Sequence, residues 1–251
     1  MSKVVLVTGV SRGIGRAIVD ELLKPGNDAV VYGIARSEEP LKELKATYPD
    51  TFSYVTGDIN DFSSLEKLVH DAVKVHGKID SVIANAGVLD PVQNVNHLDA
   101  NAWKKLFNVN FFSIVSLASI AMPHLSKAHG SLILVSSGAS VKSYYGWGAY
   151  GASKAAVNHF AMTVAQESST VKAIAVAPGV VDTQMQVDIR DVFGPNSMPP
   201  EALKRFTDLK KNNELLHPSV PAAVYARLAL KGIPNTLNGV YVRYNDERLS
   251  S

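Results

Sequence analysis

The sequence predicts an α/β fold: one domain with a doubly wound, seven-stranded, mainly parallel sheet and helices on both faces. Short runs of β-branched and other apolar residues alternate with amphipathic stretches, as at residues 4–7, 29–35 and 131–136. Continuous apolar runs of this kind are typical of strands buried on both faces. A length of 251 residues and an apolar share of 46% fit a single domain spanning residues 1–251, without repeat or linker.

The elements follow in a regular order. Strands are expected at residues 4–7, 29–35, 52–55, 81–84, 131–136, 171–177 and 239–244. Helices are expected from about residue 14, and at residues 39–46, 61–75, 100–122, 149–166 and 221–230. Residues 181–216 are richer in Pro, Asn and Met and have no strand pattern. We expect residues 184–200 to form a loop, and the segment of about 183–216 to act as a substrate loop or lid.

Composition excludes several classes of function. The net charge of +2 is too small to indicate a nucleic-acid or membrane partner. There is no cysteine, which excludes thiol catalysis and disulfides, and the seven histidines show no metal-ligand spacing, so no metal is expected. No secretory signal and no run of about 20 consecutive apolar residues is present. We therefore expect a cytoplasmic protein.

A glycine-rich turn joins the first expected strand to the first helix. Glycines at such a junction let the backbone approach a pyrophosphate, which the helix N-terminus stabilises. The alternative is an ordinary flexible turn, but the strand and helix that the motif requires are both expected here. We assign cofactor binding to Gly9, Ser11, Arg12, Gly13, Ile14 and Gly15.

The end of the second expected strand favours NADPH over NADH. NAD-binding sites place an acidic residue there, whereas this chain reads Ala35-Arg36-Ser37. The guanidinium of Arg36 can pair with a 2′-phosphate, and Arg12 points to the same corner. The alternative is that both arginines are solvated surface charges. Their joint placement, together with the missing acid, predicts NADPH/NADP⁺ as the cofactor.

Tyr150 and Lys154 are one helical turn apart and share a helix face. A nearby ammonium lowers the pKa of a phenol, so we expect Tyr150 to act as an acid that protonates a carbonyl oxygen, with Lys154 also binding the nicotinamide ribose. Ser137 follows the fifth expected strand and can hold the substrate oxygen. Taken alone, the Tyr/Lys pair could equally be a surface pair. Asn85, Ala86 and Gly87 follow the fourth expected strand at the same edge.

Together these motifs resemble the short-chain dehydrogenase/reductase family along the whole chain, with a Rossmann-type fold. The resemblance implies that Asn110 orders a water that relays protons to Lys154, and that Asp58 contacts the adenine, with Ile59 beside it. From the residues alone, Asn110 could be a packing residue and Asp58 a helix cap. The resemblance also implies that the nicotinamide is lined by Pro178, Gly179, Val181 and Thr183.

Within this family the chain is most similar to fungal members near the benzil reductase and sepiapterin reductase branch. This similarity implies NADPH-dependent reduction of ketone, diketone or aldehyde carbonyls. The alternatives are a catalytically silent, NADPH-binding regulatory protein, and an epimerase or dehydratase, for which the chain is short. Substrate contacts are expected at Tyr144, Trp147, Met185 and Val187. Family members pair through the long helix and the Tyr150 helix, so the resemblance implies a homodimer.

Overall fold

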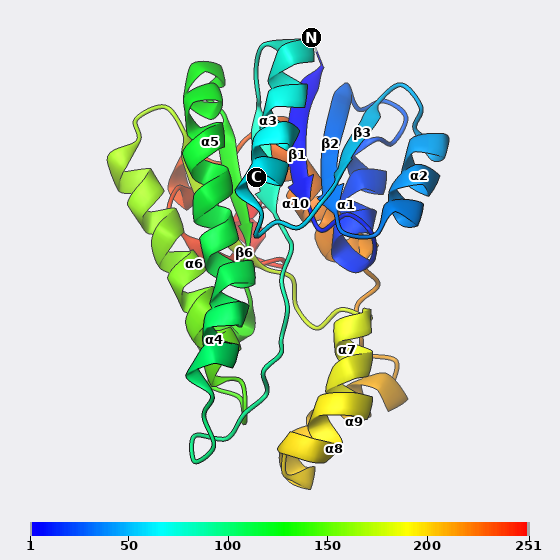
Figure 1. Ribbon diagram of the computed structural model, residues 1–251, viewed down its shortest axis with the longest axis vertical. Helices are drawn as coiled ribbons and strands as arrows, with labels where there is room; N and C mark the ends of the chain where they lie inside the picture. Colours follow the sequence, from blue (N-terminus) through cyan, green and yellow to red (C-terminus); the bar gives the residue numbers. More distant parts are fainter. Residues whose placement is uncertain (1, 250–251) are drawn as a thin grey trace.

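The structure, a computed structural model, describes residues 2–249 and contains a seven-stranded sheet (Figure 1). The strands are β1 (Lys3–Thr8), β2 (Ala29–Ala35), β3 (Phe52–Thr56), β4 (Ser81–Ala84), β5 (Ser131–Val135), β6 (Lys172–Ala177) and β7 (Tyr241–Arg243). Their order is β3-β2-β1-β4-β5-β6-β7, and every neighbouring pair is parallel. The predicted doubly wound sheet is confirmed. Strand order reverses between β1 and β4, which is where such sheets bind ligands.

Helices cover both faces of this sheet, as predicted. The first face carries α1 (Gly13–Leu22), α2 (Glu38–Thr47) and α10 (Ser219–Lys231), and the second carries α3 (Phe62–His76), α5 (Ser113–Ala128) and α6 (Gly148–Glu167). Successive side chains of β1 pack into the two apolar cores on opposite faces of the sheet, because side chains alternate across a strand. Val5 and Val7 pack with the first group of helices, and Val4 and Leu6 with the second. Short 3₁₀ turns occur at Gly138–Ser140, Asn235–Leu237 and Glu247–Leu249.

The expected helix at 100–122 is longer and is interrupted by a π-helical turn. It consists of α4 (Ala100–Phe107), the π turn η1 (Asn108–Phe112) and α5. Within residues 2–249, Ala100–Ala128 is the one helix long and apolar enough to cross a membrane by length and composition. Core helices of soluble proteins pass the same test. Here Ile114, Leu117 and Ala121 are buried in the core beneath the sheet.

The prediction of a loop at residues 184–200 was wrong, because this stretch is helical. It contains α7 (Gln184–Asp188), the π turn η3 (Ile189–Phe193) and α8 (Gly194–Ser197), followed by α9 (Pro200–Lys211). The turns are short and held by mutual packing, so no long periodic pattern reveals them. A Cβ on Gly194 would lie 2.3 Å from Leu203. We call residues 183–216 the lid. In Figure 1 its helices project below the carboxyl ends of the strands.

The two ends of the lid are joined by backbone pairing. Val181 and Leu216 form a parallel β-bridge. The Asp182 N–H donates to the Leu216 carbonyl at 2.8 Å, and the Leu216 N–H donates to the Val180 carbonyl at 2.9 Å. An ion pair of 2.9 Å between Lys210 and Asp182 lies beside this junction. The chain therefore leaves the domain and returns to it at the same place, and the lid is the segment in between.

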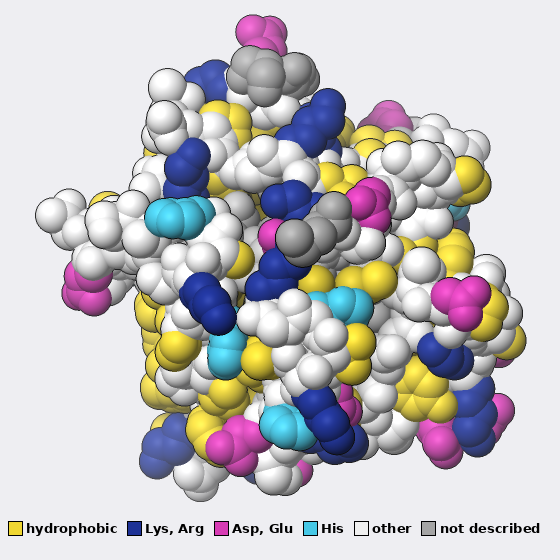
Figure 2. Space-filling model, turned by 90° about the horizontal axis from the view of Figure 1, so that it is seen from above, with side chains coloured by type: hydrophobic (Ala, Val, Ile, Leu, Met, Phe, Trp, Pro, Cys, Tyr) yellow, Lys and Arg dark blue, Asp and Glu magenta, His cyan; other side chains and the backbone are white. Residues whose placement is uncertain are grey.

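The opposite end of the molecule carries the amino ends of the strands. Figure 2 shows this end from above, with acidic side chains interspersed among the lysines and arginines. A small cavity of about 220 Å³ lies there, lined by Lys3, Asp80 and Lys172 among others. Asp80 forms ion pairs with Lys3 and Lys78, and Lys172 Nζ donates a hydrogen bond to the Ile233 carbonyl at 2.9 Å. These contacts join strand starts to neighbouring segments, and the functional residues lie at the other end.

Candidate active site

A cavity of about 1030 Å³ opens at the carboxyl ends of the strands, beneath the lid. The glycine turn, the ends of β2 to β6 and the lid all contribute to its wall. Of the residues predicted to form the site, only Asn110 and Ser37 do not line it. The other predicted residues that line it are Gly9, Ser11, Arg12, Gly13, Ile14, Gly15, Ala35, Arg36, Asp58, Ile59, Asn85, Ala86, Gly87, Ser137, Tyr144, Trp147, Tyr150, Lys154, Pro178, Gly179, Val181, Thr183, Met185 and Val187.

The glycine turn has no room for side chains at two positions. Gly9 has a φ of +74°, which favours glycine, and a Cβ there would lie 3.0 Å from Ala86 Cα. A Cβ on Gly15 would lie 2.0 Å from the Gly9 carbonyl oxygen. The turn thus presents bare backbone to the cavity at the N-terminus of α1. The pyrophosphate of a dinucleotide fits this arrangement, since both backbone N–H groups and the helix dipole favour an anion.

Asn85 holds the glycine turn in place. Its side-chain amide donates to the carbonyls of Thr8 at 3.0 Å and Gly9 at 3.3 Å. In return, Thr8 Oγ1 accepts from the backbone N–H groups of Asn85 and Ala86, each at 3.0 Å. The ends of β1 and β4 are thereby tied together at the switch point. Sequence reasoning missed the role of Thr8, although its position directly before Gly9 was visible.

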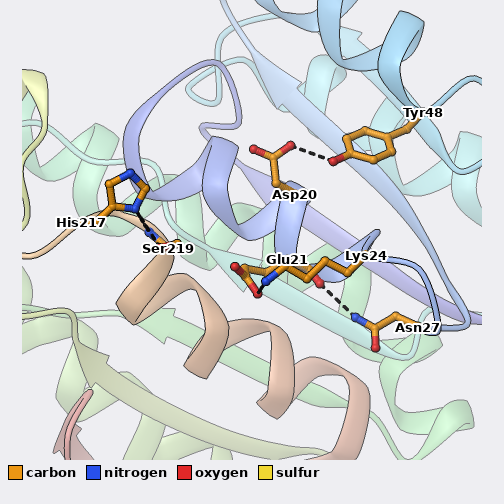
Figure 3. A network of polar contacts seen from close by, with 7 residues as sticks. All are labelled: Asp20, Glu21, Lys24, Asn27, Tyr48, His217 and Ser219. Carbon is orange, nitrogen blue, oxygen red and sulfur yellow. Dashed lines mark hydrogen bonds and ion pairs between the residues drawn. The ribbon is translucent and has the colours of Figure 1, made fainter.

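Helix α1 is held behind the turn by polar contacts along its length (Figure 3). The Tyr48 hydroxyl, at the end of α2, donates to Asp20 at 3.0 Å. Burial, more than the neighbouring Asp20, raises the pKa of Tyr48. Further along, Lys24 pairs with Glu21, and the Asn27 amide donates to the Glu21 carbonyl at 2.9 Å. The Tyr48–Asp20 hydrogen bond thus links α1 to the end of α2, whereas the two Glu21 contacts are local to the end of α1.

At the start of α10, His217 and Ser219 face α1 in the same view (Figure 3). His217 Nδ1 and Ser219 Oγ lie 2.8 Å apart. His217 also lines the cavity, as does Asp20. Sequence reasoning predicted neither, because nothing in the sequence indicates that α10 starts beside α1.

Two arginines line the corner of the cavity beside the end of β2. Arg12 and Arg36 are exposed there, and neither forms an ion pair within the described part of the chain. Arg16 also lines the cavity, but it pairs with Asp20 at 3.8 Å and Glu43 at 3.5 Å. No carboxylate directly follows β2. The corner is thus an open positive site, the arrangement that a phosphate monoester requires.

Ser37 and Asp58, both predicted to bind the cofactor, also lie close to the starts of helices α2 and α3. Ser37 is exposed at the N-cap of α2, and its side chain makes no cap hydrogen bond. Asp58 lines the cavity, and one carboxylate oxygen accepts from the Asn60 N–H at 2.9 Å. It is not the cap of α3, because Asp61 has that role.

Tyr150 and Lys154 lie in the first half of α6 and are almost fully buried, with exposed fractions of 7% and 3%. Lys154 Nζ donates to the Val135 carbonyl at 2.8 Å, at the end of β5. The same Nζ is 5.9 Å from the centroid of the Tyr150 ring. Ser137 begins the 3₁₀ turn after β5, and its hydroxyl accepts from the Ala139 N–H at 3.1 Å. The helix and the strand end thus bring three polar groups to one part of the cavity.

The expected lowering of the Tyr150 pKa was wrong for this structure. Burial raises the pKa of Tyr150, and the contact with the Ser137 hydroxyl offsets this only in part. Burial also lowers the pKa of Lys154 to about 8. The prediction assumed that the Lys154 ammonium lies next to the Tyr150 phenol and that water reaches both. In the structure Lys154 Nζ binds the Val135 carbonyl instead, and both side chains are buried, so desolvation decides the pKa. A phenol with a raised pKa remains protonated at neutral pH, as a proton donor must.

Asn110 lies in the π turn η1 and is fully buried. Its Oδ1 accepts from the Val88 N–H at 2.8 Å, and its Nδ2 donates to the Val88 carbonyl at 2.8 Å and to Ser153 Oγ at 3.2 Å. It thus joins the long helix to the segment after β4 and to α6. Asn110 is not among the residues that line the cavity, but a Cβ on Gly87 would lie 3.3 Å from Asn110 Oδ1 and 3.5 Å from Lys154 Nζ, so the two side chains lie close together. The role of Asn110 in a proton relay stays a prediction. π turns inside α-helices often mark functional sites.

Aromatic side chains wall the cavity beside Tyr150. The Trp147 ring is stacked on Phe206 of α9, with centroids 5.2 Å apart, and lies 5.0 Å from the Tyr144 ring. Met185 and Val187 line the lid side, as predicted for substrate contacts. Phe206 and Gln186, which also line the cavity, were missed because the lid helices were not expected. No cluster of three or more His, Asp or Glu residues suited to a metal occurs among residues 2–249.

These features together define a nicotinamide-dependent oxidoreductase site on a doubly wound sheet. The sequence pattern of the short chain dehydrogenase family matches residues 3–192. The chain therefore belongs to the short-chain dehydrogenase/reductase family, as the resemblance implied.

Relatives support a narrower branch of the family. An uncharacterized oxidoreductase of Saccharomyces cerevisiae is 63% identical over 250 residues, covering 100% of this chain and 98% of the relative. A benzil reductase ((S)-benzoin forming) of the same yeast is 53% identical over 258 residues, covering 99% and 98%. A crystal structure of a S. cerevisiae short-chain dehydrogenase/reductase superposes with a TM-score of 0.98 at 63% identity, covering 99% and 98%. The structure of the KRED1-Pglu enzyme gives 0.94 at 48% identity, covering 96% and 100%. The predicted resemblance to the fungal benzil reductase branch is thus confirmed.

Proposed function

We propose that this protein reduces ketone, diketone or aldehyde carbonyls to alcohols with NADPH. The observation that carries the proposal is the convergence of Ser137, Tyr150 and Lys154 at one place in a cavity that also contains the bare glycine turn. Bound NADPH supplies a hydride to the carbonyl carbon. The cavity of about 1030 Å³ has room for a dinucleotide and a small second ligand.

In this proposal Tyr150 donates its phenolic proton to the carbonyl oxygen. Its raised pKa keeps that proton in place until the substrate oxygen becomes basic. The Ser137 hydroxyl donates a hydrogen bond to the same oxygen and stabilises its developing negative charge. Lys154 holds the nicotinamide ribose, and its charge favours the phenolate left after proton transfer. Its pKa of about 8 leaves most of the amine charged at pH 7.

Arg12 and Arg36 support NADPH as the cofactor. Both line the corner beside the end of β2, where the 2′-substituent of the adenosine ribose lies in doubly wound folds. Two guanidinium groups without a carboxylate partner there favour a phosphate over a hydroxyl. Asp58, Ile59 and residues 178–183 all line the same cavity. In this proposal Asp58 and Ile59 would contact the adenine, and residues 178–183 the nicotinamide.

The substrate part of the cavity favours carbonyl compounds with planar, apolar groups. Tyr144, Trp147 and Phe206 supply aromatic surface, and Met185 adds an adaptable thioether. The similarity to a yeast benzil reductase supports aromatic ketones and vicinal dicarbonyls as the substrate class. We further propose a homodimer formed by the long helix and α6, and a cytoplasmic location. One similar structure, 61% identical, is that of a cytoplasmic protein from S. cerevisiae.

The test is a turnover assay. Oxidation of NADPH is followed at 340 nm with aromatic aldehydes, ketones and 1,2-diketones, for the wild type and Tyr150→Phe. Carbonyl-dependent oxidation that is lost in the variant supports the proposal. NADPH binding without turnover of any carbonyl would favour the alternative, a silent regulatory protein.

A further inference from the structure

Asn158 lies on α6 one helical turn beyond Lys154, on the face of the helix that also carries Tyr150. All three residues therefore lie next to the end of β5. Lys154 Nζ donates to the Val135 carbonyl, and Asn158 Oδ1 accepts from the Ser136 hydroxyl at 2.5 Å. Tyr150 and Lys154 line the cavity, whereas Asn158 does not. Asn158 thus binds the strand end that leads into the site without lining the site itself.

A chain of hydrogen bonds runs from Asn158 to the backbone of Ser137. Asn158 Nδ2 donates to Ser140 Oγ at 2.8 Å, and Ser140 Oγ donates to the Ser137 carbonyl at 2.5 Å. A hydroxyl has only one proton. Because Ser140 donates its proton to the Ser137 carbonyl, it must accept from the Asn158 amide, and the amide oxygen is left to accept from Ser136. The chain therefore has one direction and ends at the Ser137 carbonyl.

The turn that contains Ser137 also touches α6 directly. A Cβ on Gly151 would lie 2.9 Å from the Ala139 carbonyl oxygen, so the helix and the turn are in contact one residue after Tyr150. The Ser137 hydroxyl accepts from the Ala139 N–H at 3.1 Å. The carbonyl and the side chain of Ser137 leave the same Cα. A carbonyl that is held by the Asn158 chain therefore restricts where the hydroxyl can lie.

We propose that Asn158 is a positioning residue for carbonyl reduction, which holds the Ser137 hydroxyl at the spacing from Tyr150 that lets both bind one substrate oxygen. A donor that stabilises charge in the transition state must lie within hydrogen-bond reach of the reacting oxygen, and a small displacement weakens it. Asn158 acts through Ser137 and contacts neither substrate nor cofactor. This inference rests on the proposed carbonyl reduction.

The experiment is a double-mutant cycle, measured with NADPH and the carbonyl compound that the wild type reduces fastest in the turnover assay. Asn158→Ala should lower kcat about tenfold, the effect of roughly one lost hydrogen bond. The KM for the carbonyl and the Kd for NADPH should not change, because the lost interaction is made only in the transition state. A role in shaping the cavity would raise KM instead, and that result would overturn the inference.

The second side of the cycle removes the group that is positioned. In the Ser137→Ala background no hydroxyl is present, so Asn158→Ala should lower kcat by less than about twofold. Equal losses in both backgrounds would show that Asn158 acts by another route and would overturn the inference. An Asn158→Ala variant with the kcat of the wild type would also overturn it.

A second pair tests the chain without changing Ser137. Ser140→Ala should lower kcat by the same factor as Asn158→Ala, and the double variant should be no slower than either single variant. Losses that multiply would overturn the inference. Asn238→Ala is the matched control, because Asn238 Oδ1 accepts from the Ala173 N–H at 2.9 Å and neither residue lines the cavity. It should lower the melting temperature and leave kcat unchanged.

Two further measurements keep the outcomes apart. A cooperative thermal transition and unchanged NADPH affinity show that each variant is folded. A wild type that reduces no carbonyl compound would refute the proposed function instead of the role of Asn158.

Discussion

The ring of Tyr150 packs edge to face against the indole of Trp147, so the proposed proton donor is positioned by its ring as well as by its hydroxyl. Replacing Tyr150 with Phe, which keeps the ring, therefore removes the proposed proton donor and preserves the packing. Tyr150→Phe should lower kcat by at least about 100-fold, the usual contribution of a positioned acid. NADPH affinity, measured by fluorescence titration, should change little. Turnover close to that of the wild type would refute the role of Tyr150.

Burial of Lys154 predicts an unusual pH dependence of stability. Its pKa in the folded protein is about 8, against about 10.4 in the unfolded chain. Between pH 8 and pH 10 the unfolded chain therefore binds more protons, so this residue makes the free energy of unfolding increase with pH, by about 2 kcal/mol. Lys154→Met removes this contribution.

Urea unfolding at pH 8, 9 and 10 measures the effect. The measurement stops at pH 10, because the raised pKa values of Tyr150 and Tyr225 act in the opposite direction above it. The difference in stability between Lys154→Met and the wild type should shrink by about 2 kcal/mol over this range. A constant difference would show that Lys154 has an ordinary pKa.

Arg36 should set the choice between the two nicotinamide cofactors. Replacing it with Asp removes a charge-assisted hydrogen bond and places a negative charge near the 2′-phosphate. We expect the Kd for NADPH to rise roughly 10- to 100-fold or more, with a much smaller change for NADH. Lys74→Asp, an exposed lysine that does not line the cavity, makes the same charge change as a control. An unchanged preference in Arg36→Asp would exclude this role.

Asn110 joins three segments through one buried amide, so its removal should affect stability first. Asn110→Leu leaves the Val88 N–H, the Val88 carbonyl and Ser153 Oγ without these partners. An unpaired buried polar group costs about 1–3 kcal/mol. The melting temperature should fall by several degrees, on the order of 2–4 °C per kcal/mol for a chain of this size. A variant as stable as the wild type would show that these contacts contribute little.

The parallel sheet was predictable because the sequence patterns that indicate it, apolar runs and glycine positions, are each contained in a short stretch of the chain. Val4 to Val7 form a continuous apolar run, and glycine is required at positions 9 and 15 because no side chain fits at either. The order of the strands follows from the family resemblance and from the rules of doubly wound sheets. The cavity-lining residues were predictable for the same reason, since strand ends of a parallel sheet meet at one edge.

Other features depend on contacts between distant segments and were not predictable. Of the lid helices, α7 and α8 are short, and the lid is stabilised by packing of Gly194 on Leu203 and of Phe206 on Trp147. Helix α9 has 12 residues and was missed because we expected its stretch to belong to the loop or lid. The π turn at Asn110 has no marker in the sequence. The pKa direction of Tyr150 was missed because the sequence shows which residues are neighbours on a helix but not how deeply they are buried.

The paired base of the lid has an evolutionary consequence. Because the bridge between Val181 and Leu216 closes the excursion on itself, the intervening residues can lengthen, shorten or be replaced without moving β6 or α10. The segment leaves and rejoins the domain at this one point, and its main contact with the rest of the site is the stacking of Phe206 on Trp147. Paralogues that share the same proton-transfer groups could therefore diverge in what they recognise by replacing this one stretch. Chimaeras made at residues 182 and 216 that keep an aromatic ring at position 206, against Trp147, would carry the donor's selectivity into the same catalytic frame.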